Sequence, residues 1–381
     1  MAKISDFCLL KRVISFRKYL NTLDPNLTKV FFKWAVAHPG HFRSFLGLMK
    51  SCKKASETRD RLKKEGIKIP PFLILSITSM CNLACAGCYA SAAGTVSKKE
   101  KKQLSRSKWK EIIKKSSEAG VFGFVIAGGE PFLTDNLSHI CKDFSDRLFI
   151  ILTNGTAIQE KEINTLKSCK NTCVLVSMEG TKEMTDQRRG DGVHEKAQKT
   201  IQALIKAGIP TGISATITKN NFRHWMDEKL IDSLIAKGIK IAALIEYIPV
   251  TQRGNDHRLM LTSEERKEFR DFVLRIRETK KIYLIHSPGD EEYFGGCVSA
   301  GKGFAHVTPT GDLTPCPVSN IATHNLLKST IREAFSSKLF REIRESEHLL
   351  ENEGTPCALF SHPKEVNEIA KRTGAYKSAD G

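Results

Sequence analysis

From residue 71 onward, short apolar runs alternate with amphipathic stretches. The apolar runs predict six strands, at residues 72–78, 122–127, 148–153, 174–177, 212–217 and 239–248. The amphipathic stretches between them predict helices at 108–119, 160–168, 195–207 and 224–237. Such an alternation is typical of a parallel sheet covered by helices. We therefore expect an α/β fold, a partial (β/α)6 TIM-like barrel, although an open doubly wound sheet would give a similar pattern. In either fold, ligands bind at the carboxyl ends of the strands.

The pattern differs on both sides of this region, so we divide the chain into three domains: 1–70, 71–285 and 286–381. The first reads as a basic, helical N-terminal extension. The second ends with a helix at 263–280, opened by Thr262 or Ser263 with acidic residues in its first turn. The third is rich in Gly and Pro, with a predicted hairpin around 310–312 and a basic helix at 329–344.

The net charge of +18 is concentrated in the extension. Residues 1–70 hold 16 Lys and Arg against 5 Asp and Glu, a net charge of +11. With the aromatic residues in segment 16–50, this charge fits a helix lying on a membrane, but apolar residues at helical spacing equally fit a cap on the main domain. No apolar run predicts a transmembrane helix or a secretory signal, so we expect a cytoplasmic protein, with peripheral membrane contact as an option. Nucleic-acid binding is not indicated, since no recognised fold motif accompanies the charge.

The eleven cysteines carry the strongest chemical signal. An odd number in a chain without an export signal indicates reduced thiols, so metal binding outranks disulfides. Cys81, Cys85 and Cys88 follow the first predicted strand in a C-x3-C-x2-C spacing. Thiolates suit zinc or an iron–sulfur cluster, but structural zinc needs four ligands and no fourth is close in sequence. Three cysteines on a [4Fe–4S] cluster leave one iron open for a substrate.

This loop resembles the cluster loop of radical S-adenosylmethionine (SAM) enzymes. The resemblance implies that the open iron binds SAM, that the reduced cluster cleaves it, and that the resulting 5′-deoxyadenosyl radical takes a hydrogen atom from a substrate. An electron donor such as ferredoxin or flavodoxin is then required. One departure is Gly87, where the family has an aromatic residue that packs beside the adenine. Tyr89 is the candidate to replace it.

Other motifs at the predicted strand ends extend the resemblance over about residues 72–250. Gly128, Gly129 and Glu130 resemble the family's GGE motif, whose backbone and acid contact the SAM amino group. Alone, this motif could be a turn, and the segment 177–190 could be a salt-bridged loop. The further candidate contacts to SAM are Asn154, Ser177, Arg189 and Asn220.

Three cysteines remain in the last domain: Cys297, Cys316 and Cys357. Their context resembles the SPASM/twitch extension of radical SAM enzymes and implies a second [4Fe–4S] cluster. Its fourth ligand is left open among the substrate and three histidines, His306, His324 and His362. The alternative is three buried structural thiols.

The sequence therefore predicts a radical SAM enzyme, an oxidoreductase or transferase. Relatives with a SPASM/twitch extension often modify peptides, so a peptide or protein is the expected substrate. The basic aromatic segment motivates an alternative, a lipid or other membrane-associated substrate. A non-enzymatic iron–sulfur electron carrier is the third interpretation, and it predicts iron without SAM cleavage.

Overall fold

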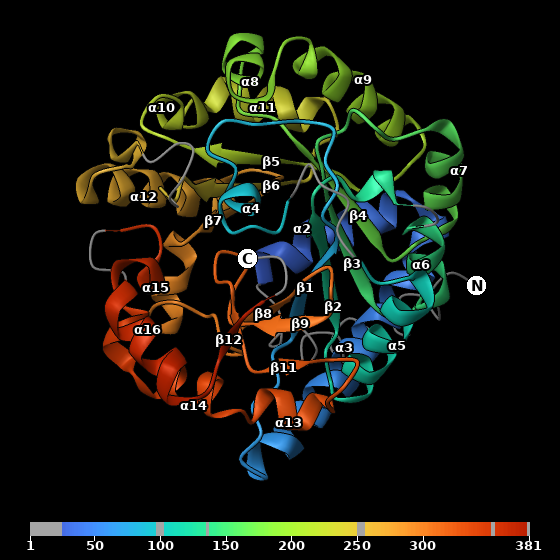
Figure 1. The fold of residues 1–381 in the computed structure, drawn as a ribbon. Coiled ribbons are helices and arrows are strands. Elements are labelled where there is room, and N and C mark those ends of the chain that lie inside the picture. Colours follow the sequence, from blue (N-terminus) through green and yellow to red (C-terminus); the bar gives the residue numbers. More distant parts are fainter. Residues whose placement is uncertain (1–24, 97–102, 135–136, 250–255, 352–354, 379–381) are drawn as a thin grey trace.

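The computed structural model describes most of the chain, in the ranges 25–96, 103–134, 137–249, 256–351 and 355–378 (Figure 1). The part of segment 16–50 that precedes residue 25 lies outside the described residues, as does Cys8.

The six predicted strands form consecutive parallel neighbours in one sheet, which confirms the α/β barrel (Figure 1). They are β1 (Phe72–Thr78), β2 (Gly123–Gly128), β3 (Leu148–Thr153), β4 (Thr172–Ser177), β5 (Thr211–Ile217) and β6 (Ile241–Glu246). Leu73 and Leu75 are fully buried, as are Phe124 and Phe149, because apolar side chains of these strands pack beneath the surrounding helices. The helices therefore leave the carboxyl ends of the strands at one rim, where the sequence predicts ligands.

The sheet has four further strands. β7 (Tyr283–Ser287) pairs parallel with β6 and runs across the predicted domain boundary at 285. β8 (Phe304–Val307) pairs parallel with β1, so the C-terminal region continues the barrel sheet on its other side. β9 (Asp312–Thr314) and β11 (His324–Asn325) extend it antiparallel, while β10 (Ile321–Ala322) pairs with β12 (Tyr376–Lys377) in a small second sheet. The division into three domains stays a prediction.

Helices cover the outside of the barrel between successive strands (Figure 1). Those in predicted positions are α5 (Arg106–Glu118), α7 (Glu160–Ser168), α9 (Val193–Lys206) and α12 (Ser263–Thr279). Thr262 caps α12: its side chain accepts a hydrogen bond from the Glu265 amide, and the Glu265 side chain accepts one from the Thr262 amide. The shorter elements are α4 (Tyr89–Ala92), α6 (Leu137–Asp143), α8 (Lys182–Arg189), α15 (Ala358–Ser361), α16 (Pro363–Arg372), η2 (Pro131–Leu133), η3 (His257–Leu259), η4 (Gly289–Phe294) and η5 (Glu347–Leu350).

Two predicted helices are each divided in two. The stretch 224–237 forms α10 (Phe222–Trp225) and α11 (Glu228–Ala236), and 329–344 forms α13 (Ile331–Phe335) and α14 (Lys338–Glu345). In both cases the second helix begins at a side-chain cap, Asp227 or Ser337, which accepts a hydrogen bond from a backbone amide of the new helix. Such caps start a new helix inside an amphipathic pattern that periodicity alone reads as continuous.

The N-terminal helices α2 (Pro25–Ala37) and α3 (Pro39–Lys64) pack on the barrel. Leu27 and Phe31 of α2 contact a cluster of apolar strand residues. Along each strand these residues alternate with the residues that pack beneath the outer helices. This cluster lies on the inner face and consists of Cys173, Leu175, Ile241 and Ala243 with Ile150, Leu152 and Ile285. Because strand side chains alternate between faces, α2 closes the interior of the barrel.

The aromatic residues of this segment also pack on one another. Phe32 of α2 makes edge contacts with Phe42 and Phe45 of α3, and Trp34 stacks on His38. The described part of the segment therefore acts as a cap on the barrel. No helix within the described ranges is both long and apolar enough to cross a membrane.

We predict that Phe31→Ala lowers the free energy of unfolding by about 1–3 kcal/mol, because it removes apolar contacts inside the barrel. Val36→Ala, on the same helix but 53% exposed, should change it by less than about 0.5 kcal/mol. Urea denaturation of both variants tests this. Equal effects of the two substitutions would contradict the packing of α2 in the barrel.

Candidate active site

The first cysteine loop leaves the carboxyl end of β1. Cys81, Cys85 and Cys88 are partly buried, and Cys88 is the residue before α4. Burial raises the pKa of the Cys81 thiol, and the neighbouring Cys85, Glu130 and Cys88 raise it further. The three thiols thus lie near one another. No three His, Cys, Asp or Glu side chains of the described residues are arranged to hold a single metal ion. Three neighbouring soft donors fit a [4Fe–4S] cluster with one open iron.

The end of β2 lies against the start of this loop. The Gly129 amide donates to the Thr78 carbonyl (2.8 Å), and the Glu130 amide donates to the Met80 carbonyl (2.8 Å). A Cβ atom on Gly129 would lie 1.9 Å from the Met80 oxygen. The sequence interpretation gave these glycines a close approach to a ligand. The structure shows that Gly129 makes a close approach to the cysteine loop itself.

Glu130 is almost fully buried (1% exposed), and protein groups bind both of its carboxylate oxygens. Oε1 accepts from the Thr153 hydroxyl (2.7 Å) and the Phe132 amide (3.1 Å), and Oε2 accepts from the Asn154 amide (2.7 Å). Burial raises the pKa of the Glu130 carboxyl, and these hydrogen bonds lower it. Glu130 therefore joins the ends of β2 and β3, and its contact with SAM stays a prediction.

Asn154 connects the end of β3 to the cysteine loop. Its side-chain amide donates to the side-chain oxygen of Asn82 (2.9 Å), the residue that follows Cys81. Asn82 in turn donates to the Thr156 hydroxyl (2.8 Å), and the Asn154 side-chain oxygen accepts from Thr156. Asn154 therefore lies beside the start of the cysteine loop, and its contact with SAM stays a prediction.

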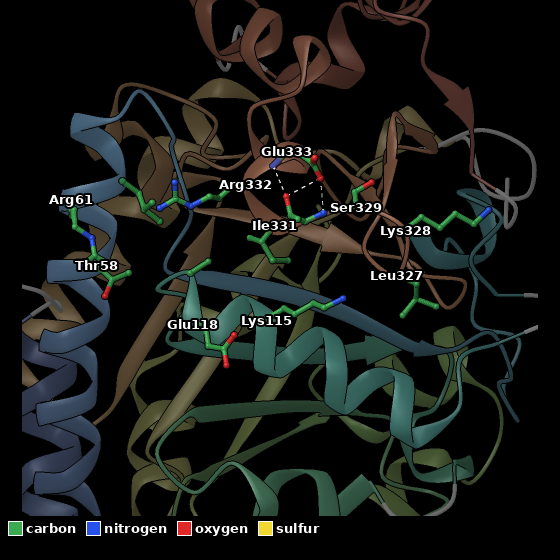
Figure 2. A pocket seen from close by; sticks show the side chains of 13 residues that line it. Thr58, Arg61, Lys115, Glu118, Leu327, Lys328, Ser329, Ile331, Arg332 and Glu333 are labelled. Atoms are coloured by element: carbon green, nitrogen blue, oxygen red, sulfur yellow. Dashed lines mark hydrogen bonds between the residues drawn. The ribbon is translucent and has the colours of Figure 1, made fainter.

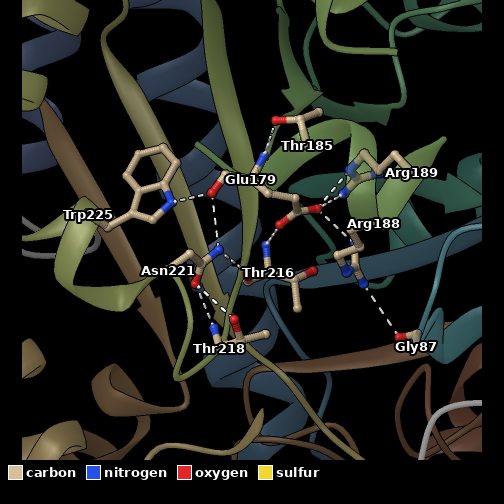
Figure 3. A network of polar contacts seen from close by, with 9 residues as sticks. All are labelled: Gly87, Glu179, Thr185, Arg188, Arg189, Thr216, Thr218, Asn221 and Trp225. Carbon is tan, nitrogen blue, oxygen red and sulfur yellow. Dashed lines mark hydrogen bonds and ion pairs between the residues drawn. The ribbon is translucent and has the colours of Figure 1, made fainter. Parts of the chain in front are cut away.

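The centre of the polar network at this rim is Glu179, which belongs to the segment 177–190 noted above as a possible salt-bridged loop (Figure 3). Its carboxylate accepts from Arg188 Nη1 (2.8 Å), and Arg189 Nε donates to it at 2.7 Å. The other oxygen accepts from the Thr216 amide (2.8 Å) of β5. Its backbone carbonyl accepts from the side chains of Asn221 and Trp225. Arg189, predicted to contact SAM, is thus held by Glu179, whose side chain is 2% exposed.

The same arginines connect the network to the cysteine loop (Figure 3). Arg188 Nη2 donates to the Gly87 carbonyl (3.4 Å), and the Ala86 amide donates to the Arg188 carbonyl (2.8 Å). Burial raises the pKa of the Cys85 thiol, and Arg189 and Arg188 oppose this by lowering it. Positive charge held here stabilises a thiolate, the form that ligates iron.

An aromatic side chain does lie beside Gly87, but it comes from the end of β6. Gly87 has φ +63°, and a Cβ atom on it would lie 2.7 Å from Tyr247 Cε2. Tyr247 is buried, and its amide donates to the Ile217 carbonyl (2.8 Å). The sequence hypothesis assigned this aromatic role to Tyr89, whose pKa is raised by burial. Tyr247 fills the space that an aromatic side chain at position 87 would need. This contact joins residues far apart in the sequence, so no local pattern indicates it.

The remaining predicted contacts differ in their placement. Ser177 ends β4 and is partly buried, opposite Ser214 of β5. Asn220 is exposed, whereas the adjacent Asn221 is buried and bonds Glu179, Thr216 and Thr218. Sequence reasoning therefore missed Asn221, and two consecutive asparagines offered no signal to choose between them.

The C-terminal cysteines Cys297, Cys316 and Cys357 come together. Burial raises the pKa of the Cys316 thiol well above its ordinary value, and the neighbouring thiols of Cys357 and Cys297 raise it further. Of the predicted histidine ligands, His306 uses both ring nitrogens within the protein, with Ser76 Oγ (2.7 Å) and Thr314 Oγ1 (2.8 Å). This buried histidine cannot bind iron without losing one of these contacts.

A separate cleft of about 460 Å³ lies between α3, α5 and α13 (Figure 2). Its lining includes Arg61, Lys115 and Arg332, together with the capping pair Thr330 and Glu333. None of the predicted site residues lines it, so we do not assign it to the candidate active site.

Comparison with known proteins agrees with this geometry. Residues 75–230 match the family model of the Radical SAM superfamily. Mycofactocin maturase MftC of Mycobacterium tuberculosis (strain ATCC 25618 / H37Rv) is 26% identical over 301 residues, 74% of each chain. AdoMet-dependent heme synthase of Methanosarcina barkeri (strain Fusaro / DSM 804) is 23% identical over 309 residues, 74% of this chain and 86% of the relative.

Among solved structures, Streptococcus suis SuiB bound to precursor peptide SuiA has a TM-score of 0.63 and 18% identity. The match covers 78% of this chain and 73% of SuiB. At this identity the likeness shows a common fold and no more. It agrees with the partial barrel that the sequence predicts.

We predict opposite effects for two glycine substitutions. Gly129→Ala should lower the free energy of unfolding by about 1–3 kcal/mol, because the new Cβ atom meets the Met80 carbonyl. Gly47→Ala in α3 has open space and should raise it by about 0.5–1 kcal/mol through helix propensity. Chemical denaturation measures both, and a neutral Gly129→Ala would show that the loop does not need this close contact.

We also predict that Glu179→Gln lowers the free energy of unfolding by about 3 kcal/mol, because it leaves two partly buried guanidinium groups without their carboxylate. Iron retained by the cysteine loop should fall as Arg188 loses its position. Glu118→Gln, at an exposed position of α5, is the control and should change stability by less than about 0.5 kcal/mol. Thermal unfolding and iron analysis test both variants, and a Glu179→Gln protein like wild type would contradict the central role of this carboxylate.

Proposed function

We propose, from the premise that this chain is a radical SAM enzyme, that Cys81, Cys85 and Cys88 hold its [4Fe–4S] cluster and that the surrounding rim binds SAM. When bound, the cluster supplies the electron that cleaves SAM to a 5′-deoxyadenosyl radical, which then takes a hydrogen atom from the substrate. The observation that supports this assignment is the convergence of the three thiols at the carboxyl end of β1.

The protein's own residues supply position and charge. Glu179 holds Arg188 and Arg189 near Cys85, where their positive charge favours the thiolate. Glu130 and Asn154 fix the ends of β2 and β3 beside Cys81, and both are candidates for binding SAM. Tyr247 packs against Gly87 on one side of the loop.

We propose a peptide or protein as the substrate. Support comes from MftC, which is named a maturase, and from SuiB, whose structure holds a precursor peptide. The relative named a heme synthase favours a second candidate, a heme-related tetrapyrrole. The lipid alternative has lost part of its motivation, because Leu27 and Phe31 pack inside the barrel.

Two further parts belong to this proposal. Ferredoxin or flavodoxin is the expected electron donor. Cys297, Cys316 and Cys357 are the expected ligands of a second cluster, because three neighbouring thiols, two of them buried, are a donor set suited to iron and sulfide.

We predict that anaerobically reconstituted protein, given SAM and dithionite, releases 5′-deoxyadenosine. The triple variant Cys81→Ala/Cys85→Ala/Cys88→Ala should release none, because the open iron is lost. The matched control Cys52→Ala/Cys141→Ala/Cys169→Ala removes three buried thiols elsewhere and should retain the activity. Chromatography quantifies the product, and no release by iron-replete wild type would overturn uncoupled cleavage and favour the electron carrier.

The same assay separates the substrate classes. Stimulation of release by a synthetic peptide pool, with a deuterium label passing from peptide to 5′-deoxyadenosine, would support the peptide proposal. Stimulation by an iron porphyrin alone would replace it with the heme-related candidate.

A further inference from the structure

The C-terminal thiols are brought together from three separate segments. Cys297 follows η4, and its amide donates to the Leu350 carbonyl (2.6 Å). Cys316 follows β9, where the Ala300 amide donates to the Pro315 carbonyl (3.0 Å). Cys357 precedes α15, and the Ser361 hydroxyl donates to its carbonyl (3.1 Å). These contacts hold the three thiols around one place in the protein; Cys297 and Cys316 are buried and Cys357 is partly buried.

A fourth acidic group faces the same place. Glu291 lies in η4, and the Gly296 amide donates to its backbone carbonyl (3.1 Å). This hydrogen bond forms a turn that brings Glu291 near Cys297. The Glu291 side chain is hydrogen-bonded to Cys297, and it lies close enough to Cys357 to raise the pKa of that thiol. The four side chains therefore form one group: three thiols and one carboxyl.

Glu291 is partly buried, and its surroundings do not balance the charge of a carboxylate. The groups acting on it are the Cys297 thiol, the Ser287 hydroxyl (3.5 Å), the Val298 backbone and the Asp290 carboxylate, and none of these is positive. The nearby guanidinium of Arg277 is bound to Asp290 instead (2.7 Å). A carboxylate among these neighbours has no positive partner within the protein, and a bound iron ion would supply one.

Of the three candidate histidines, two are hydrogen-bonded to other side chains. His306 is engaged on both ring nitrogens, and His324 Nδ1 contacts the Thr323 hydroxyl (2.9 Å). His362 pairs through Nδ1 with Glu365 (3.4 Å), while its buried Nε2 has no hydrogen-bond partner. His362 is therefore the rival that an experiment has to test.

We propose that Glu291 is the fourth protein ligand of an iron–sulfur cluster held by Cys297, Cys316 and Cys357. This inference rests on the second cluster of the proposed function. Binding would release the protons of the thiols and the carboxyl, so that four anionic donors face the irons. With four protein ligands the cluster has no open iron, and it serves electron transfer and not substrate binding.

The test uses the full chain with Cys81→Ala/Cys85→Ala/Cys88→Ala, so that all iron reports on the second cluster. Adding Glu291→Gln should reduce bound iron from about four to about three per chain and produce the electron paramagnetic resonance signal of an oxidised [3Fe–4S] cluster. Glu291→Cys should restore about four irons, because a thiolate replaces the carboxylate and shows that the site still folds. Glu345→Gln, an exposed glutamate of α14, is the matched control and should leave iron and spectrum unchanged.

Each result decides between the possibilities. Unchanged iron and spectrum with Glu291→Gln would overturn the ligation by Glu291 and leave the cluster itself in place. Loss of one iron with His362→Gln but not with Glu291→Gln would assign the position to His362. A background protein that binds no iron would overturn the second cluster, and with it this inference.

Discussion

The arrangement of the candidate active site depends on one buried carboxylate, that of Glu179. It receives two arginines from α8 and one backbone amide from β5, while its own carbonyl receives Asn221 and Trp225. A buried carboxylate is stable only when its charge and hydrogen bonds are matched, so these elements share a single arrangement. Arg188 then carries this constraint to Gly87 and Ala86 and thus to the three cysteines. A second carboxylate, Glu130, fixes the other side of the loop through β2 and β3.

The two ends of the barrel serve different purposes. Polar side chains gather at the carboxyl ends of the strands, while α2 fills the interior from the other side with Leu27 and Phe31. A small barrel has its interior filled by side chains, and here residues of α2 supply part of the filling. The described part of the basic extension therefore has a structural role, before any partner is invoked.

How far the sequence predicts this structure depends on the range of the interactions. The strands and outer helices follow from local periodicity, and the Thr262 cap from a local motif. The pairing of β8 with β1 joins residues more than 200 positions apart, and no local pattern specifies it. The contact of Tyr247 with Gly87 is also long-range. The binding of Arg189 by Glu179 is local, but it depends on which of several possible partners the arginine chooses. Cysteine spacing indicates the first candidate site, whereas no spacing rule indicates Glu291, the ligand proposed for the second.

The sheet register also bears on what the second thiol group can do. Thr314 of β9 pairs with His306 of β8, and Phe304 of β8 pairs with Phe72 at the amino end of β1. Cys316, two residues after Thr314, therefore lies toward that end, whereas the first cysteine loop leaves the carboxyl end of β1. Seven residues of strand separate the two ends by roughly 20 Å. A substrate that reacts at the first site and also ligates iron at the second would have to span this distance, which a side chain of the protein beside the thiols does not. Ligation by Glu291 would leave this cluster without an open iron, and electron transfer is the role that we propose for it.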